Sequence, residues 1–237
     1  MIVAKPWATS AAGRAGLDIL YEDSALLFVN KPAGIVVQRG YDADEPVLLE
    51  IAVEYAGPLF LMQRLDRGTS GVMFFSKLAS INANLTRQFE RKGIRKRYVA
   101  LCEGELGEPQ TIDAPLVRIG PISFGVGDAG KRAMTVVTPK RATRAGSLVA
   151  IDLLTGRTHQ IRVHMAGIGH PLIGDWLYGQ RNAARPMLHA KELSMTHPLT
   201  NEPLRVGAPL PDDFCHTADE RGIVSRGEDI VTLCECS

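Results

Sequence analysis

The amino-acid sequence predicts an α+β fold built on a mostly antiparallel sheet. Segments of strand length and segments with helical spacing are interspersed, without the regular alternation of a parallel α/β protein. No glycine-rich dinucleotide or phosphate-binding fingerprint follows a predicted strand. With 237 residues, of which 45% are hydrophobic and 22% charged, the chain is long enough to bury a sizeable core. These observations indicate a globular domain and say nothing of its chemistry.

The expected strands are short runs of bulky apolar residues separated by turn residues. Pro32 and Gly34, for example, end the second run and turn the chain. In chain order the strands are expected at residues 17–23, 25–31, 59–65, 71–77, 97–101, 133–137, 147–154 and 187–195. Residues 105–133 are rich in glycine and proline, which predicts a loop, and the proline-rich residues 196–211 are expected to be extended.

Three helices are expected, at residues 48–55, 79–91 and 158–168. In the second, Ile81, Leu85 and Phe89 recur every four residues and therefore share one face. Gly93 is expected to end that helix. Beyond residue 214 the chain is polar, so we expect it to fray.

One main domain is therefore expected over residues 17–214, between an irregular lead-in of residues 1–16 and an acidic tail of residues 215–237. The start of the chain has no apolar h-region and no run is long enough to span a bilayer, so neither a secretory signal nor a membrane partner is expected. The cysteines match neither a zinc ribbon nor a disulfide framework; they are Cys102, Cys215, Cys234 and Cys236. We expect a reduced, cytoplasmic monomer.

Charge is unevenly distributed along the chain. The formal net charge is only +1, but residues 212–237 hold seven acidic and two basic residues, which leaves +6 for the rest. Much of the excess lies in residues 87–97, a run that includes Arg95 and Lys96. Such a run is usually a solvated face, and it becomes a candidate phosphate contact only if it borders a site.

The most informative segment places one aspartate between two arginines, in a polar insert between apolar runs. Arg64 and Arg67 would keep the carboxylate of Asp66 ionised and ready to act as a nucleophile or a base. Gly68 and Gly71 permit a tight backbone. Taken alone, the segment is more simply interpreted as a surface turn closed by an Asp–Arg pair.

A second candidate segment spans residues 155–164. On a helix, Thr158 and Arg162 would share a face, so Arg162 could point back toward a site beside the helix start. His159 and His164 are five residues apart, off the spacing of a metal pair, and no carboxylate or thiolate accompanies them at motif spacing. No metal site is expected.

Tyr98 is the third candidate, because it follows the basic run on a predicted strand. A tyrosine in that setting could stack on a nucleobase. On its own, an ordinary half-buried strand tyrosine is the simpler interpretation.

Together these segments resemble the RluA-type RNA pseudouridine synthase family. Residues 64–71, R-L-D-R-G-T-S-G, match the family signature H-R-L-D-R-x-T-S-G after its first position. The other four matching motifs, in family order, are residues 22–23 with 30–34, 96–100, 156–164 continued by 170–175 and 178–179, and 188–190. Five motifs in order over about residues 17–212 make a specific match.

The resemblance implies the pseudouridine synthase catalytic fold: a long, mixed, mainly antiparallel sheet with flanking helices and a central RNA-binding cleft. It implies an isomerase that converts a specific uridine of a tRNA or rRNA stem-loop to pseudouridine, without metal or organic cofactor. The C1′–N1 bond is cleaved, the base rotates and a C1′–C5 bond forms. Reaching that bond requires unstacking the nucleotide, for which a stacking aromatic and basic backbone contacts are suited.

The family's site residues carry over onto matching positions. Asp66 takes the place of the catalytic aspartate, either as nucleophile or as the base that abstracts a ribose proton. Arg162 takes the place of its ionic partner, and Tyr98 that of the residue stacking on the flipped base. The positions that match or border RNA-binding positions are Arg64, Arg67, Arg95, Lys96, Ile161 and Leu188.

Two departures from the family pattern stand out. Gln63 occupies the position where many members carry histidine; we expect altered positioning and retained activity. The first motif begins near residue 19, which leaves no separate RNA-binding module before it, so substrate choice is expected to rest on the catalytic domain.

The sequence argues against two other functions. A non-catalytic RNA-binding module on the same fold would be expected to lack Asp66 or Tyr98, and both are present. An unrelated hydrolase using Asp66 with His159 or His170 would need a nucleophile elbow or a metal triad, and neither pattern occurs.

Overall fold

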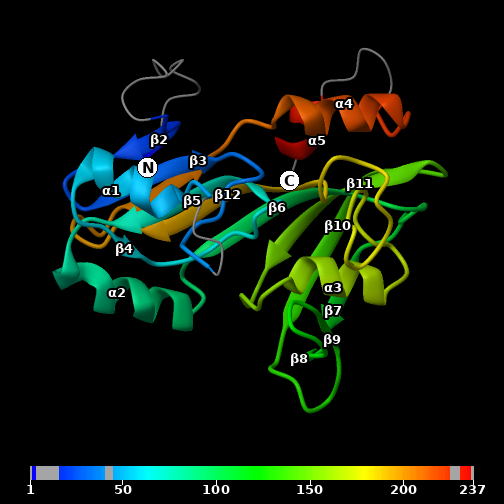
Figure 1. Ribbon diagram of the computed structural model, residues 1–237, viewed down its shortest axis with the longest axis horizontal. Helices are drawn as coiled ribbons and strands as arrows, with labels where there is room; N and C mark the ends of the chain where they lie inside the picture. The colour runs from blue at the N-terminus through cyan, green and yellow to red at the C-terminus, as the bar shows by residue number, and fades with distance from the viewer. Residues whose placement is uncertain (1, 4–15, 41–44, 225–229, 236–237) are drawn as a thin grey trace. The chain divides into compact units, whose positions relative to one another are not determined.

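The computed structural model describes residues 2–3, 16–40, 45–224 and 230–235. The chain divides into two units (Figure 1). The first comprises residues 1–96 and 190–209, and the second comprises residues 97–189 and 210–237. Each unit combines strands with helices, so the predicted α+β class is confirmed.

The strands of the first unit form a mixed sheet around two fully buried runs. The order is β2 (Ile19–Glu22), β3 (Leu26–Lys31), β5 (Ser70–Ser76) and β12 (Leu188–Thr196). β4 (Phe60–Leu61) pairs with β5, β13 (Pro203–Gly207) pairs with β12, and β1 (Ile2–Val3) runs parallel to β13. β3 and β5 pair antiparallel and are buried almost throughout, which explains why both appear in the sequence as unbroken apolar runs. The predicted strand at residues 59–65 is reduced to two residues.

Helices α1 (Leu48–Ala56) and α2 (Ala79–Glu90) belong to this unit, at positions close to those predicted. Ile81 and Leu85 of α2 are buried. Phe89, one turn further on, stacks on Phe74 of β5 with ring centroids 6.2 Å apart. The four-residue spacing therefore marked the face of α2 that packs on the sheet.

The second unit contains an antiparallel sheet and a separate hairpin. The sheet order is β6 (Arg95–Cys102), β11 (Gly146–Leu153), β10 (Met134–Thr143) and β7 (Gln110–Asp113). β8 (Leu116–Arg118) and β9 (Phe124–Val126) form a separate two-stranded sheet, and Leu116 also bridges to Lys131. The prediction of a loop over residues 105–133 is therefore wrong in part, because three strands of three or four residues are too short to show a period in the sequence.

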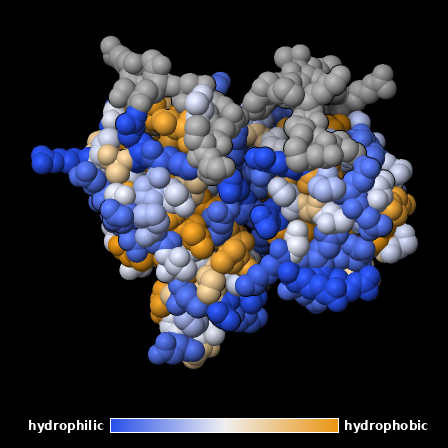
Figure 2. All heavy atoms as spheres, turned by 180° about the vertical axis from the view of Figure 1, so that it is seen from behind, coloured by the Kyte–Doolittle hydropathy of each residue, from blue (hydrophilic) through white to orange (hydrophobic). Residues whose placement is uncertain are grey.

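The β8–β9 hairpin projects from the second unit and carries exposed apolar side chains (Figures 1 and 2). Ile119 is 66% exposed, Ile122 57% and Val126 53%. At its base the hairpin is anchored by Leu116 and Phe124, which pack against Val163 of α3 (Gln160–Gly167).

The C-terminal part of this unit is folded, so the expectation of a frayed tail is wrong for the described residues. Helix α4 (Asp212–Glu220) buries Phe214 and Ala218, four residues apart, against Leu101 of β6. Helix α5 (Ile230–Glu235) adds Ile230 to the same core. Of the predicted irregular lead-in, residues 2–3 form β1, and residues 1 and 4–15 lie outside the described chain, as does Cys236.

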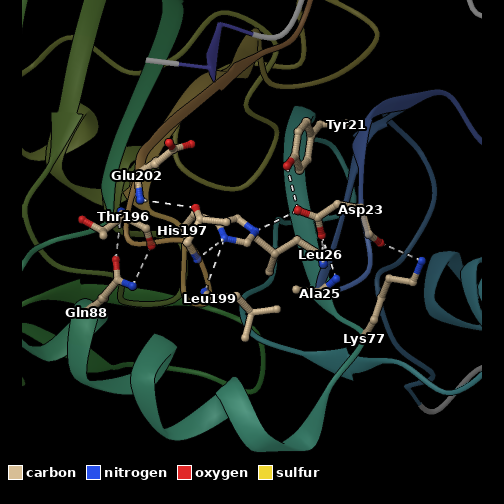
Figure 3. Close-up of polar contacts among 11 residues, drawn as sticks. Tyr21, Asp23, Ala25, Leu26, Lys77, Gln88, Thr196, His197, Leu199 and Glu202 are labelled. Carbon is tan, nitrogen blue, oxygen red and sulfur yellow. Dashed lines mark hydrogen bonds and ion pairs between the residues drawn. The ribbon is translucent and has the colours of Figure 1, made fainter.

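A polar cluster fastens the turn after β12 to the turn between β2 and β3 (Figure 3). His197 Nε2 donates to Asp23 Oδ2 at 2.8 Å, and Nδ1 accepts the N–H groups of residues 199 and 200. Because Nδ1 accepts, the ring proton lies on Nε2. The Tyr21 hydroxyl donates to the same carboxylate at 2.7 Å, and its other oxygen accepts the N–H groups of residues 25 and 26.

Among the described residues, no helix combines the length and the apolarity needed to cross a bilayer.

Candidate active site

Asp66 lies in the turn that leads into β5. The Thr69 N–H donates to the Asp66 carbonyl at 3.0 Å and closes the turn. Leu65 is buried beside it, whereas Asp66 itself is half-buried. Gly71 follows with φ +112°, and a Cβ there would lie 2.2 Å from the Ala190 carbonyl oxygen. Only glycine fits this position, so the backbone after Asp66 has little freedom.

A buried lysine holds this turn from within the protein. Lys31 is 0% exposed, and its Nζ donates to the carbonyl oxygens of Pro32 (2.9 Å), Arg67 (3.2 Å) and Thr69 (2.8 Å). An ammonium has three donors, and burial of its charge is tolerable only when they are engaged. Two of the three acceptors belong to the turn, so Lys31 fixes the peptide groups on the C-terminal side of Asp66.

The two arginines beside Asp66 differ in their surroundings. Arg67 forms an ion pair with Glu45 at 2.8 Å, and its Nε donates to the Gly34 carbonyl at 3.0 Å. Arg64 is exposed. Arg67 therefore contacts Glu45 and the loop of Gly34, both of which precede the turn along the chain. Proximity along the chain does not set side-chain direction, because neighbours in an extended segment point to opposite sides.

Arg162 lies on α3 in a buried ionic cluster. Its Nε and Nη2 donate to Asp175 Oδ2 and Oδ1, both at 2.7 Å. The carboxylate of Asp175 is 0% exposed and the Arg162 side chain 6%. The Tyr178 ring lies against the guanidinium, with its centroid 5.1 Å from Arg162 Cζ. Because α3 begins at Gln160, Thr158 is outside the helix and the predicted shared face with Arg162 is wrong.

Tyr98 and two apolar candidates are buried in the second unit. Tyr98 lies on β6, on the face opposite to Val99 and Leu101, which pack in the α4 core. Ile161 on α3 and Leu188 at the start of β12 are each 4% exposed. These positions are compatible with an apolar wall around a base.

The two cations at the end of the basic run differ in environment. Arg95 is exposed. Lys96 is half-buried, with its Nζ 5.7 Å from the centroid of the Phe89 ring, and burial lowers its pKa. Arg95 therefore presents its charge to solvent more fully than Lys96 does.

The histidines of α3 and its start are engaged in hydrogen bonds. His164 Nε2 lies 2.9 Å from the Ala114 carbonyl and Nδ1 2.9 Å from Thr135 Oγ1, and burial lowers the pKa of this ring. His159 Nδ1 lies 2.8 Å from the Tyr178 hydroxyl. No group of three or more His, Cys, Asp or Glu side chains that could hold a metal ion occurs in the described part of the chain.

The predicted site residues divide between the two units. The first unit contains Arg64, Asp66, Arg67, Arg95 and Lys96. The second unit contains Tyr98, Ile161, Arg162 and Leu188. Within the first unit the structure fixes the turn of Asp66, and within the second it fixes the guanidinium of Arg162.

Three residues of these arrangements had no role in the sequence-based prediction: Lys31, Asp175 and Tyr178. All three fall in segments that match family motifs, so the match marked their positions without their contacts. A charged residue in an apolar run is itself a signal, because such a residue is rarely buried unless it is paired. Lys31 ends β3, and Asp175 follows a buried run of residues 172–174.

Comparison with known proteins decides the family. The family model described as RNA pseudouridylate synthase matches residues 25–167, a span that includes Asp66, Tyr98 and Arg162. The chain belongs to this family. The RluA-type resemblance found in the sequence is thereby confirmed.

Relatives of this pseudouridine synthase chain have been assigned to two kinds of RNA. It is 36% identical over 217 residues to the ribosomal large subunit pseudouridine synthase D of Nitrosomonas europaea, covering 84% of the chain and 63% of that protein. It is 36% identical over 234 residues to the tRNA pseudouridine synthase C of Salmonella typhimurium, covering 87% of the chain and 90% of that protein. The chain thus spans less than two thirds of the ribosomal relative.

The fold also matches a solved member of the family. The human RNA pseudouridylate synthase domain containing 1 superposes with a TM-score of 0.72 at 26% identity, covering 87% of this chain and 88% of that one. Synthases of this family are isomerases that act on RNA.

Proposed function

We propose that this chain converts a specific uridine of a tRNA or rRNA stem-loop into pseudouridine, with Asp66 as the catalytic residue. The observation that carries the proposal is the family match over residues 25–167, which contains Asp66 in a turn held by Lys31. A catalytic group gains from such a turn, because a reacting carboxylate must be held close to one geometry.

The proposed reaction is an isomerisation. The C1′–N1 bond of the uridine breaks, the uracil turns, and C5 bonds to C1′ while the proton on C5 is lost and N1 gains one. Asp66 either attacks the nucleotide or abstracts a ribose proton, and both routes need an ionised carboxylate. All atoms of the nucleotide are kept and there is no net oxidation, so the reaction calls for no electron acceptor.

The other residues have roles in exposing and holding the base. Tyr98 stacks on the flipped uracil and assists removal of the C5 proton. Ile161 and Leu188 provide the apolar wall of the pocket. Arg64, which is exposed, fills the space that the base leaves.

Arg162 is the proposed ionic partner of Asp66. A guanidinium stays charged at any pH at which proteins fold, so it favours the ionised carboxylate. Arg67 and Arg95 contact the RNA backbone, with a smaller contribution from Lys96.

The test is pseudouridine mapping by carbodiimide labelling and primer extension. Total RNA is compared from cells that lack the gene and carry either the wild-type protein or Asp66→Asn. We expect one site to be lost in both the deletion and the Asp66→Asn strain, and its RNA names the substrate.

Purified protein separates the remaining interpretations. Asp66→Asn should abolish turnover on tRNA or rRNA transcripts while binding them with a Kd within about threefold of wild type, because the substitution is nearly isosteric. A wild-type protein that binds these RNAs and forms no pseudouridine in any of them would instead favour the non-catalytic binding module. Full activity in Asp66→Asn would refute the assigned mechanism.

A further inference from the structure

We propose that Asp175, supported by Tyr178, is a positioning residue that sets both the orientation and the net charge of Arg162. This inference rests on the proposed function, in which Arg162 is the partner of the catalytic carboxylate. It names the residues that prepare Arg162 for that task.

The fork between the two side chains fixes the guanidinium plane. Asp175 accepts from Nε and from Nη2 of Arg162, both at 2.7 Å. A guanidinium has five N–H groups in one plane, and this fork engages two of them on one edge. The remaining groups, on Nη1 and the far side of Nη2, are thereby directed to the other edge, toward which any second carboxylate must lie.

Asp175 is itself placed by its own loop. Its Oδ1 also accepts the N–H groups of Leu177 at 3.1 Å and Tyr178 at 3.3 Å. The loop before it is equally constrained: Gly174 has φ +78°, and a Cβ there would lie 2.0 Å from the Arg185 carbonyl oxygen. The carboxylate therefore directs Arg162, because the backbone holds it independently of the arginine.

The Tyr178 ring is a second, differently anchored support. The ring centroid lies 5.1 Å from Arg162 Cζ, within cation–π range. The hydroxyl accepts the Phe124 N–H at 2.9 Å and lies 2.8 Å from His159 Nδ1. A ring tied at its outer end to β9 and to the start of α3 cannot turn away from the guanidinium.

The charge of Asp175 has a separate effect from its geometry. Buried together, Asp175 and Arg162 form a pair without net charge, so Arg162 offers a second carboxylate directed hydrogen bonds with a reduced positive field. Removing the negative charge at Asp175 while keeping its shape should strengthen the field that Asp66 experiences. Because the proposed chemistry needs an ionised carboxylate, the acid limb of the rate–pH profile should respond to this change in field.

The experiment compares Asp175→Asn with Asp213→Asn in the full chain. Asp213 makes a fork of the same type with a buried arginine of the same unit: Arg185 Nε and Nη2 donate to its carboxylate at 2.6 and 2.9 Å. Single-turnover pseudouridine formation and RNA Kd are measured from about pH 4 to pH 9, on the RNA identified by the mapping. Urea unfolding reports the folded fraction.

For Asp175→Asn we expect a rate about 10- to 100-fold lower than wild type, the loss typical when a residue that orients another functional side chain is removed. The Kd for RNA should stay within about threefold of wild type. The acid limb of its rate–pH profile should move to lower pH. Asp213→Asn should lose stability and leave both the rate of the folded protein and the acid limb unchanged. The inference would be overturned if the acid limb of Asp175→Asn stayed at its wild-type position and the smaller folded fraction accounted for the whole loss of rate.

A second variant keeps the test decisive if Asp175→Asn does not fold. Tyr178→Phe keeps the ring and removes only the hydroxyl, and we expect a rate about threefold lower at unchanged Kd. An unchanged rate would count against the supporting role of Tyr178. Failure of the proposed function is distinguishable, because in that case the wild-type protein itself forms no pseudouridine.

Discussion

At the scale of single residues, the most consequential side chain outside the proposed chemistry is Lys31. Its ammonium is completely buried and donates to three carbonyl oxygens, two of which belong to the turn that carries Asp66. Lys31→Met fits the space but leaves these oxygens without their donor. We expect unfolding in urea to show a loss of about 3 kcal/mol, the range for breaking a buried charged network.

The matched control for Lys31 is Lys77→Met. Lys77 Nζ pairs with Glu22 at 2.8 Å and donates to the Asp23 carbonyl, with 22% of the side chain exposed. A partly solvated pair of this kind contributes less than about 1 kcal/mol. Equal losses from both variants would show that the carbonyl cluster at Lys31 contributes no special stability.

The family resemblance predicted roles for Asp66 and Arg162, and the structure adds contacts nearby that the sequence did not predict. Arg67 turns to Glu45, and Arg162 is held by Asp175, thirteen positions further along the chain. Which charge meets which depends on the fold that separates the two segments. The motif match therefore located the candidate site before the structure supplied its contacts.

At the scale of elements, the cluster that joins the β12–β13 turn to the β2–β3 turn should make stability depend on pH. Burial alone would raise the pKa of Asp23, but hydrogen bonds from Tyr21, from backbone N–H groups and from His197 outweigh it, and the pKa is lowered. Burial, followed by the hydrogen bond and charge of Asp23, raises the pKa of Tyr21 from 10.0 to about 12. The two shifts act at opposite ends of the pH range.

Stability from Asp23 is present above the ordinary carboxyl pKa and is lost as pH falls through the lowered value. Stability from Tyr21 is present below its ordinary pKa and is lost as pH rises through about 12. In urea unfolding across pH, Tyr21→Phe should reduce the alkaline loss and Asp23→Asn should reduce the acid loss. An alkaline limb that survives unchanged in Tyr21→Phe would exclude this cluster as its source.

The spacing of apolar residues predicted the helices and strands that bury a whole face or run, and it did not predict the others. β3, β5 and α2 show apolar patterns because they bury whole faces or runs. α4 buries only Phe214 and Ala218 in an otherwise polar segment, so it was taken for a frayed tail. Asp212 and Asp213 in its first turn were a sequence signal for the start of a helix, since acidic residues are favoured at a helix N-terminus.

At the scale of the whole molecule, the modest net charge of +1 predicts RNA binding of moderate strength that weakens with salt. Each phosphate contact adds to the slope of log K against log salt. Arg95→Gln should reduce that slope by about one unit per lost contact. Lys96→Gln should change it less, because the Lys96 ammonium lies against Phe89.

The measurement is filter binding of the substrate RNA between about 50 and 200 mM salt. Turnover at saturating RNA should be close to wild type in both variants, since neither residue is proposed to touch the reacting atoms. A slope for Lys96→Gln that falls more than that for Arg95→Gln would reverse the assignment of the main contact.

The first unit is discontinuous in the chain, and this has a consequence for synthesis on the ribosome. β5 has β12 as its neighbour, yet β12 is translated only after the first and longer segment of the second unit. Until Thr196 has emerged, the nascent first unit lacks a complete β12 and keeps an open strand edge, the kind of surface on which chains aggregate. A polypeptide released after Arg162 and before Leu188 would contain Asp66 and Arg162 and still lack both β12 and β13.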